Sequence, residues 1–171
     1  MTSSDVIAAE SSRSCGECTA CCEGWLEDVS LDMKPGKSCA HLKNSACSIY
    51  EARPENPCRR FTCAWLHQPE QYPEDLRPDR SGAIVMWDRY WQDWQVLRAV
   101  PTGEKIPPET FEWLRDCAKS QGLPLLFVER ALNDEGYAGD QLFAMGSPAF
   151  AEAVRNGFQD DDLFGMASPH W

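Results

Sequence analysis

Apolar residues recur in patterns typical of β-strands in the second half of the chain. The stretches 83–87 and 94–100 are both rich in apolar residues, so we expect two strands there. The polar stretch 88–93 between them predicts the loop of an antiparallel hairpin. A third strand is expected at 125–129, and we predict that all three strands belong to one sheet.

Two helices are predicted to accompany these strands. The first begins at Pro107–Pro108, since proline is tolerated in the first turn of a helix, and ends near Gly122. One face of it carries Phe111, Leu114 and Ala118. The second begins at Ser147–Pro148, which has the character of an N-cap followed by a first turn, and ends near Gly157.

The first half of the chain contains few large aliphatic residues. Between residues 15 and 66 they are nearly all in this set: Leu26, Val29, Leu31, Leu42, Ile49 and Leu66. We expect a short strand at 29–31 and a turn at 34–37, followed by a small hairpin that presents Cys39 and Cys47. A short helix is expected around residues 58–67. A segment of this size buries too little apolar surface to be stable alone, so it needs another source of stability.

These patterns predict an α+β protein in which a small cysteine-rich N-terminal half packs on a small antiparallel sheet with helices. The chain of 171 residues suits one compact domain or one domain with a small satellite. We expect a tail at 1–14, a cysteine-cluster region at 15–68, an α+β region at 69–158 and a second tail at 159–171. A Pro-rich, charged connector at 69–80 is expected to separate the two halves.

Eight of the nine cysteines lie within fifty residues, which is typical of a metal site. They are Cys15, Cys18, Cys21, Cys22, Cys39, Cys47, Cys58 and Cys63. Thiolates are soft ligands that suit zinc, copper(I) and iron–sulfur centres. Cys18 and Cys22 have i,i+4 spacing, so one helical turn would place both sulfur atoms on one face. Cys21 and Cys22 are adjacent and would point in different directions, which favours two metal centres over one.

The cysteine stretches resemble the YkgJ-like cysteine-cluster family, which is described as a zinc- or iron-chelating domain. The matching pieces are residues 15–22, 39–42, 47–54 and 58–63, and they include all eight family cysteines. The resemblance covers residues 15–66 closely and the later half only loosely. It implies that the eight cysteines ligate metal. Flagellin lysine N-methylases are similar around such a cluster, but no other feature of this chain indicates a methyltransferase.

Three kinds of chemistry are compatible with the cysteine pattern. Two all-sulfur zinc sites of four cysteines each are the first interpretation, with one or two zinc ions as the cofactor. An iron–sulfur cluster is the alternative, because Cys15, Cys18 and Cys21 reproduce the C-x2-C-x2-C start of bacterial ferredoxins. Cys22 departs from that pattern, since it follows at once where a ferredoxin has three further residues. The third interpretation is buried structural cysteines with adventitious disulfides.

Several other residues are candidates for function. The set comprises His41, His67, Arg53, Arg59, Arg60, Cys117, Trp87, Tyr90, Trp91 and Trp94. Either histidine could replace a thiolate, but an ordinary hydrogen-bonded or exposed histidine is favoured because eight cysteines already complete two sites. The arginines could donate hydrogen bonds to thiolates or form a solvated basic surface, and both interpretations stay open. Cys117 is expected to be a buried structural thiol, and sheet packing is favoured for the aromatic group.

The net charge of -11 and the pI of about 4.6 argue against a nucleic-acid partner, which requires a cationic surface. Two divalent cations on eight thiolates would change the charge by -8 + 4, to -15. The N-terminus lacks the pattern of a secretory signal, and no apolar run reaches the roughly 20 residues that span a bilayer. We therefore expect a cytoplasmic protein with reduced thiols and no membrane partner. An odd count of nine cysteines also leaves one unpaired in any disulfide scheme.

The expected function is metal binding, in which zinc or iron organises the fold and supports interaction with a protein partner. One alternative is an iron–sulfur protein that acts as a redox carrier or as part of a protein-modifying enzyme. Another is an adaptor that uses the acidic and aromatic second half. No phosphate-binding loop, Rossmann fingerprint, nucleophile elbow or zincin helix is present in the sequence, so no catalytic residue is assigned.

Overall fold

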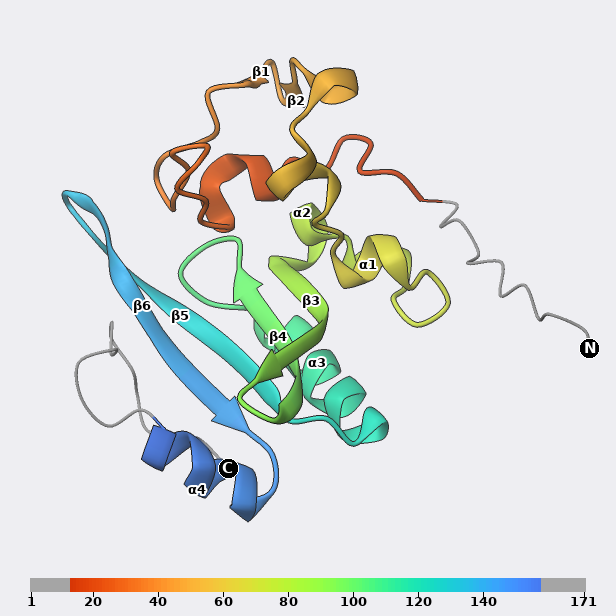
Figure 1. Ribbon diagram of the computed structural model, residues 1–171, viewed down its shortest axis with the longest axis vertical. Coiled ribbons are helices and arrows are strands. Elements are labelled where there is room, and N and C mark those ends of the chain that lie inside the picture. The colour runs from red at the N-terminus through yellow and green to blue at the C-terminus, as the bar shows by residue number, and fades with distance from the viewer. Residues whose placement is uncertain (1–12, 158–171) are drawn as a thin grey trace, which may run out of the picture.

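The computed structural model describes residues 13–157, in which a cysteine module (residues 13–63) lies above a sheet unit (residues 64–157) (Figure 1). The module contains little regular structure. Its elements are strands β1 (Leu42–Lys43) and β2 (Ala46–Cys47) and single helical turns at Cys21–Trp25, Tyr50–Ala52 and Glu55–Arg59. Loops and turns make up the rest, as expected for a segment with few large aliphatic residues.

The sheet unit is built on a four-stranded sheet. Its elements are α1 (Ala64–His67), a turn at Glu74–Leu76, α2 (Pro78–Ser81), β3 (Ala83–Trp91), β4 (Trp94–Pro101), α3 (Pro108–Gln121), β5 (Leu125–Asn133), β6 (Gly136–Met145) and α4 (Pro148–Gly157). The strand order is β3-β4-β5-β6, with antiparallel pairs at both edges and a parallel pair β4–β5 in the middle. The parallel pair requires a crossover connection, and α3 provides it.

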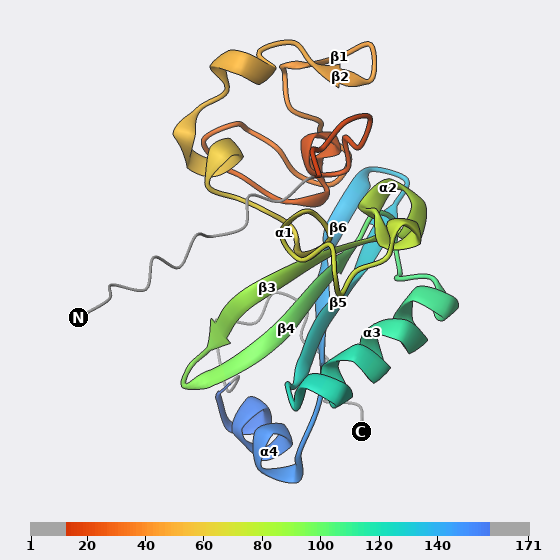
Figure 2. The same cartoon turned by 90° about the vertical axis from the view of Figure 1, so that its right-hand side faces the viewer.

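Helices cover both faces of this sheet (Figure 2). Leu125 and Phe127 on β5 belong to a core that also contains Leu114 of α3. Leu126, between them in the sequence, belongs to a second cluster with Phe150 of α4. Successive side chains of a strand point to opposite faces, so α3 and α4 pack on opposite sides of the sheet.

The larger core continues from the sheet into the base of the cysteine module. Its buried members include Trp65 of α1 and Ala20 and Cys63 of the module. Tyr72 and Leu76, in the expected connector at 69–80, are also buried in this core. The connector therefore packs against the sheet, and one hydrophobic core supports both regions.

The long hairpin β5–β6 extends beyond the sheet and reaches the cysteine module (Figures 1 and 2). Arg130 on β5 is buried, and its Nη2 donates a 2.6 Å hydrogen bond to the carbonyl oxygen of Trp25. The same guanidinium lies 5.7 Å from the centre of the Trp25 ring. This contact joins positions 105 residues apart in the sequence.

The α+β class is confirmed, and so are the hairpin, the helix and the third strand in one sheet. The helix at 108–121 ends before Gly122, whose φ of 66° forms its cap, and α4 has the expected bounds. The sheet is mixed rather than antiparallel because β4 and β5 are parallel. The expected loop at 88–93 is wrong: β3 runs to Trp91, after a bulge at Asp88, which has a φ of 50°.

Strand β6 was not predicted, and β5 is longer than predicted. The sequence of β6 begins Gly-Tyr-Ala-Gly-Asp-Gln and lacks the apolar alternation on which strand prediction depends. In their distal halves, β5 and β6 pair with each other and not with β4. Polar residues are tolerated on both faces of this part of the hairpin. The expected tails, 1–14 and 159–171, lie almost entirely outside the described residues.

Three local predictions for the module are wrong. Residues 29–31 form a turn rather than a strand, and Val29 is 99% exposed. Cys18 precedes the helical turn that begins at Cys21, so Cys18 and Cys22 do not share one helix. The expected helix around 58–67 is interrupted, because the turn at Glu55–Arg59 ends before α1 begins at Ala64. The expected hairpin is present as β1 and β2, and Cys47 is its last residue.

Candidate metal centre

Cys21 and Cys22 open the helical turn Cys21–Trp25, and Gly24 allows the chain to fold tightly around it. Gly24 has a φ of 93°, and an added Cβ would lie 2.1 Å from the carbonyl oxygen of Lys34. The same atom would lie 2.7 Å from the carbonyl oxygen of Lys37. Only glycine permits this approach, so the loop at 34–37 packs directly on the backbone beside Cys22.

Hydrogen bonds of the backbone bring Cys39 and Cys47 to this turn. The amide of Cys39 donates to the carbonyl oxygen of Cys22 at 2.8 Å. The amide of Leu42 donates to the carbonyl oxygen of Cys39 at 3.0 Å, and Leu42 is the strand partner of Cys47. The β1–β2 hairpin therefore connects three of the candidate ligands.

Cys58 and Cys63 flank the bend that leads from the module to the sheet unit. Arg59 fixes this bend, because its guanidinium donates to the carbonyl oxygens of Arg53 at 3.0 Å and Glu51 at 2.7 Å. Cys63 immediately precedes α1, and its carbonyl oxygen accepts from the amide of His67 at 3.0 Å. Cys63 is buried, whereas Cys58 is only partly so.

Burial and neighbouring thiols both raise the pKa of cysteines in the module. Burial raises the pKa of Cys63 to about 11, and the charges of Cys15 and Cys18 act in the same direction. Burial also raises the pKa of Cys58, and Cys39 and Cys47 add to the effect. A bound cation would oppose this effect, because a coordinating metal stabilises the thiolate.

The thiols are gathered without reaching ligand distances. Among residues 13–157, no three His, Cys, Asp or Glu side chains are close enough to hold a metal ion as they lie. Thiols influence one another's pKa over several ångströms, whereas sulfur ligands at about 2.3 Å from one zinc lie only about 3.8 Å apart. The donor set fits a thiolate-bound metal in chemistry and number, and binding would require the side chains to converge.

The three arginines of the module differ in their surroundings. Arg59 binds backbone carbonyls as described above, and Arg60 is an exposed partner of Glu55 at 3.8 Å. Arg53 stacks on the ring of Tyr50 at 3.8 Å, and its Nε is buried without a hydrogen-bond acceptor.

Among the three arginines, Arg53 is the one that faces the thiols. Burial lowers its pKa, but Tyr50 and the charges of Cys15 and Cys58 outweigh burial and raise it. The charge of Arg53 in turn acts to lower the pKa of Cys58. A buried, unused N–H beside two thiols is a suitable donor to a metal-bound sulfur.

The histidines and the aromatic group pack as ordinary side chains. The ring of His67 stacks on Trp87 of β3 at 3.8 Å, which fixes it against the sheet. The amide of His41 donates to the sulfur of Cys39 at 3.5 Å. Trp91 and Trp94 pack on Phe150 of α4. Tyr90 is the exposed member of the aromatic group, at 65%.

Cys117 lies apart from the module, on α3, where it packs against the sheet core. Its sulfur accepts a hydrogen bond from Nε2 of Gln121 at 2.9 Å. Burial raises the pKa of Tyr72, and the charge of Cys117 contributes in the same direction. Cys117 was expected to be buried, and the structure shows it packed against the core but only partly buried.

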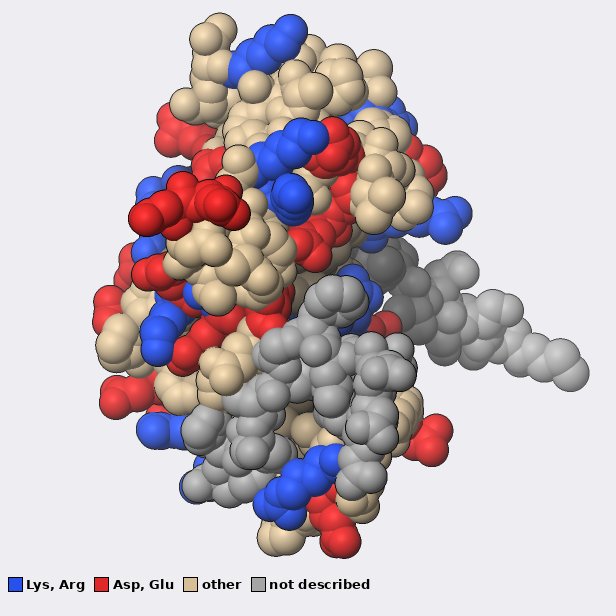
Figure 3. Space-filling model, turned by 90° about the vertical axis from the view of Figure 1, so that its left-hand side faces the viewer, with Lys and Arg blue, Asp and Glu red and all other residues tan. Residues whose placement is uncertain are grey.

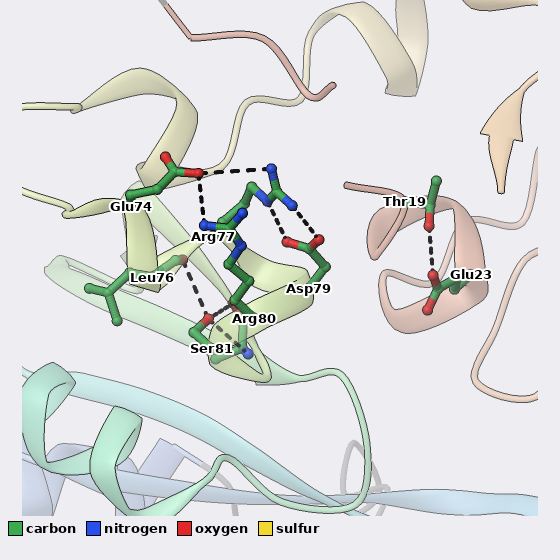
Figure 4. Close-up of polar contacts among 9 residues, drawn as sticks. Thr19, Glu23, Glu74, Leu76, Arg77, Asp79, Arg80 and Ser81 are labelled. Carbon is green, nitrogen blue, oxygen red and sulfur yellow. Dashed lines mark hydrogen bonds and ion pairs between the residues drawn. The ribbon is translucent and has the colours of Figure 1, made fainter. Parts of the chain in front are cut away.

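Helix α2 brings an acidic residue to the cysteine module. Arg77 donates two hydrogen bonds to Asp79, at 2.7 and 2.8 Å (Figure 4). This pairing lowers the pKa of Asp79. Burial raises the pKa of Cys18, and the backbone of Asp79 opposes that rise while its charge reinforces it. Figure 4 also shows Thr19 beside Glu23 of the helical turn Cys21–Trp25, where Oγ1 of Thr19 donates a hydrogen bond to Oε1 of Glu23 at 2.6 Å.

Gly24, Arg130 and Asp79 contribute to the centre without having been predicted. Gly24 carries a local signal, since a glycine within a helical turn indicates an unusual backbone or a close approach. Arg130 and Asp79 are charged residues far from the cysteines in sequence, and no local pattern marks either of them.

On the face shown in Figure 3, lysine and arginine side chains are interspersed with aspartate and glutamate. None of the helices among residues 13–157 has the length and apolar character to cross a bilayer.

A scan against protein-family models, a search of curated proteins and a search of solved structures each returned no match.

Proposed function

We propose that this protein binds zinc or iron through eight thiolates and that the metal organises the cysteine module. The ligands are Cys15, Cys18, Cys21, Cys22, Cys39, Cys47, Cys58 and Cys63. One observation carries the proposal. Four separate stretches of chain bring these eight thiols into one module, and the ninth cysteine lies on α3 of the sheet unit.

Zinc is the first candidate because an all-sulfur tetrahedral site is a structural site by default, with no open position for a substrate. The module has the composition that such a site supports, with many turns and few buried aliphatic residues. The protein is proposed to act in the cytoplasm, where thiols remain reduced and available to a metal.

An iron–sulfur centre is the second candidate function, and one observation favours it. Cys15, Cys18 and Cys21 have ferredoxin spacing, and Cys15 and Cys18 both contribute to the raised pKa of Cys21. Such a centre would make the protein a redox carrier or part of a protein-modifying enzyme.

Metal analysis of the full chain, purified anaerobically under reducing conditions, tests the proposal. We expect one or two equivalents of zinc per chain, or iron with sulfide in cluster stoichiometry. A colourless preparation that contains zinc supports the first candidate, and a brown one that contains iron and sulfide supports the second. The control is Cys117→Ser, which should retain the wild-type metal content. A wild-type chain without bound metal, even after reconstitution with zinc or iron, would refute the proposal.

A further inference from the structure

The eight candidate ligands differ in how they pack against the hydrophobic core. Cys63 belongs to the core shared with the sheet, and Cys18 and Cys21 pack against it. In the described part of the chain, Cys22, Cys39, Cys47 and Cys58 belong to neither hydrophobic cluster, and neither does Cys15, which is joined to Cys18 by a backbone turn. The thiols therefore occupy two environments, one on the core and one outside it.

Backbone contacts follow the same division. On the core side, the amide of Cys18 donates to the carbonyl oxygen of Cys15 at 2.8 Å. Outside the core, the amide of Cys39 donates to the carbonyl oxygen of Cys22, and the β1–β2 hairpin brings Cys47 beside Cys39. These contacts join Cys15 to the cysteines on the core, and they join Cys22, Cys39 and Cys47 to one another.

The positions of the adjacent residues Cys21 and Cys22 agree with this division. Both lie in the helical turn Cys21–Trp25, and successive side chains of a helical turn do not face each other. Cys21 packs against the core and Cys22 does not. Cys58, which also lies outside the core, completes the outer set.

We propose that the module holds two metal ions in separate four-sulfur sites. The inner site is Cys15, Cys18, Cys21 and Cys63, and the outer site is Cys22, Cys39, Cys47 and Cys58. The peptide bond between Cys21 and Cys22 joins the two sites. This inference rests on the proposed metal binding, to which it adds the number of ions and the ligands of each.

The two sites should release metal at different rates. Opening the inner site disturbs the core around Cys63 and Trp65, which is shared with the sheet. Opening the outer site disturbs the β1–β2 hairpin and the loops around it, which bury little apolar surface. Local openings that expose less buried surface require less free energy, so the outer ion should leave first.

Counting zinc ions on the full chain by native mass spectrometry tests the division. The wild type should hold two ions after reconstitution with zinc under reducing conditions. Cys18→Ser in the inner site and Cys47→Ser in the outer site should each retain one. The retained ion also shows that the module of each variant still folds.

Double variants test whether Cys18 shares a site with Cys63 and Cys47 shares the other site with Cys58. Two substitutions in one site, Cys18→Ser with Cys63→Ser or Cys47→Ser with Cys58→Ser, should still leave one ion. Cys18→Ser with Cys47→Ser should leave none, and Cys117→Ser should leave two. An ion retained by the mixed pair, or two ions lost by a single variant or a same-site pair, contradicts the division.

The same variants test the rates of release. A zinc chelator should remove the two wild-type ions in a fast and a slow phase. Cys47→Ser, which keeps the inner site, should release its ion in the slow phase. Cys18→Ser, which keeps the outer site, should release its ion in the fast phase. The reverse assignment would contradict the inner and outer positions. A wild type that binds a single ion contradicts the division but leaves metal binding intact, whereas a wild type that binds none refutes the proposed function itself.

Discussion

The cysteine module and the sheet unit are stabilised in different ways. In the module, the buried hydrophobic residues are Ala20, Met33, Cys39 and Cys63, together with Pro35. In the sheet unit, buried aliphatic and aromatic side chains occur on every strand and on α3 and α4. At about 25 cal/mol per Å² of apolar surface, burial stabilises the sheet unit far more than the module.

This difference explains why the cysteines are concentrated in one region. A segment with so few buried apolar side chains does not offset the conformational entropy lost on folding. If the thiols bind metal as proposed, metal–thiolate bonds between distant parts of the segment would supply what burial does not. The comparison predicts that metal, backbone fit and local charge matter to the module, while the sheet unit is largely insensitive to them.

The largest expected effect is that of metal removal. Structural zinc contributes on the order of 10–16 kcal/mol at neutral pH, which equals or exceeds the stability of a typical domain. A strong chelator under reducing conditions should therefore abolish the protection of amides 15–66 in hydrogen exchange. Amides of β3, β4 and β5 should stay protected, because their core includes Ile84, Leu97 and Leu125, each at most 2% exposed.

The boundary between the two responses is expected near α1, since Trp65 belongs to the sheet core. If the amides of residues 15–63 stay protected once metal analysis shows the chain to be metal-free, the thiols do not hold the fold together. A redox role for them would then be the better explanation.

The next largest effect is expected at Gly24. An alanine there combines a strained backbone with an overlap against the carbonyl oxygen of Lys34, together about 4 kcal/mol. Gly36→Ala is a matched control, because Gly36 also has a positive φ, of 83°, but an added Cβ has no atom within 4 Å. Hydrogen exchange of the module amides should detect the larger loss in Gly24→Ala, and equal losses in both variants would show that overlap with the loop at 34–37 is unimportant.

The sequence predicts the sheet unit better than the module, for physical reasons. Helix α3 carries a local pattern because one of its faces packs on the core, and strands β3 to β5 carry runs of apolar residues because helices cover both faces of the sheet. Strand β6 was missed because it pairs with β5 through its backbone and carries polar residues where the hairpin leaves the sheet.

In the module, the predictable part is which residues are candidate ligands, because clustered cysteines are a local signal. Their geometry depends on long-range contacts, such as the hydrogen bond from Cys39 to Cys22 and that from Arg130 to Trp25. No periodic pattern encodes such contacts. Expected helical spacing failed there for the same reason, since the path between Cys18 and Cys22 follows turns rather than one helix.

An intermediate effect is expected at Arg53. Loss of a side chain that donates a hydrogen bond to a metal ligand typically lowers metal affinity about 10–100-fold. Arg53→Gln removes both the charge and the buried Nε–H beside Cys15 and Cys58. Arg60→Gln is the control, since Arg60 is exposed and its pairing with Glu55 at 3.8 Å should contribute little.

Competition of each arginine variant with a zinc chelator measures this change in affinity. A second readout is the sulfur-to-metal charge-transfer band of the cobalt-substituted protein, which should shift in Arg53→Gln and not in Arg60→Gln. Equal affinities and unshifted bands in both variants would mean that Arg53 acts only through its stacking on Tyr50.

The smallest effect is expected at Arg130, where the hairpin contacts the module. Arg130→Met removes the donor to the carbonyl oxygen of Trp25, which costs about 1.5–3 kcal/mol for a charged hydrogen bond. The same change removes a cost, because Nε and Nη1 of Arg130 are buried without hydrogen-bond partners and Nη1 lies 3.9 Å from Asp140. Asp140 remains in this variant, but it is 26% exposed and its contact with Nη1 is long, so losing that contact should add little and the net loss should be about 1 kcal/mol. Urea unfolding measures this loss of stability. The control is Arg115→Met, whose exposed pair with Asp116 should change stability by less than about 0.5 kcal/mol.

In hydrogen exchange, the loss of protection in Arg130→Met should appear near Trp25 and in the distal part of β5–β6. A loss spread evenly over the sheet would show that Arg130 serves the sheet core rather than the contact between the two regions.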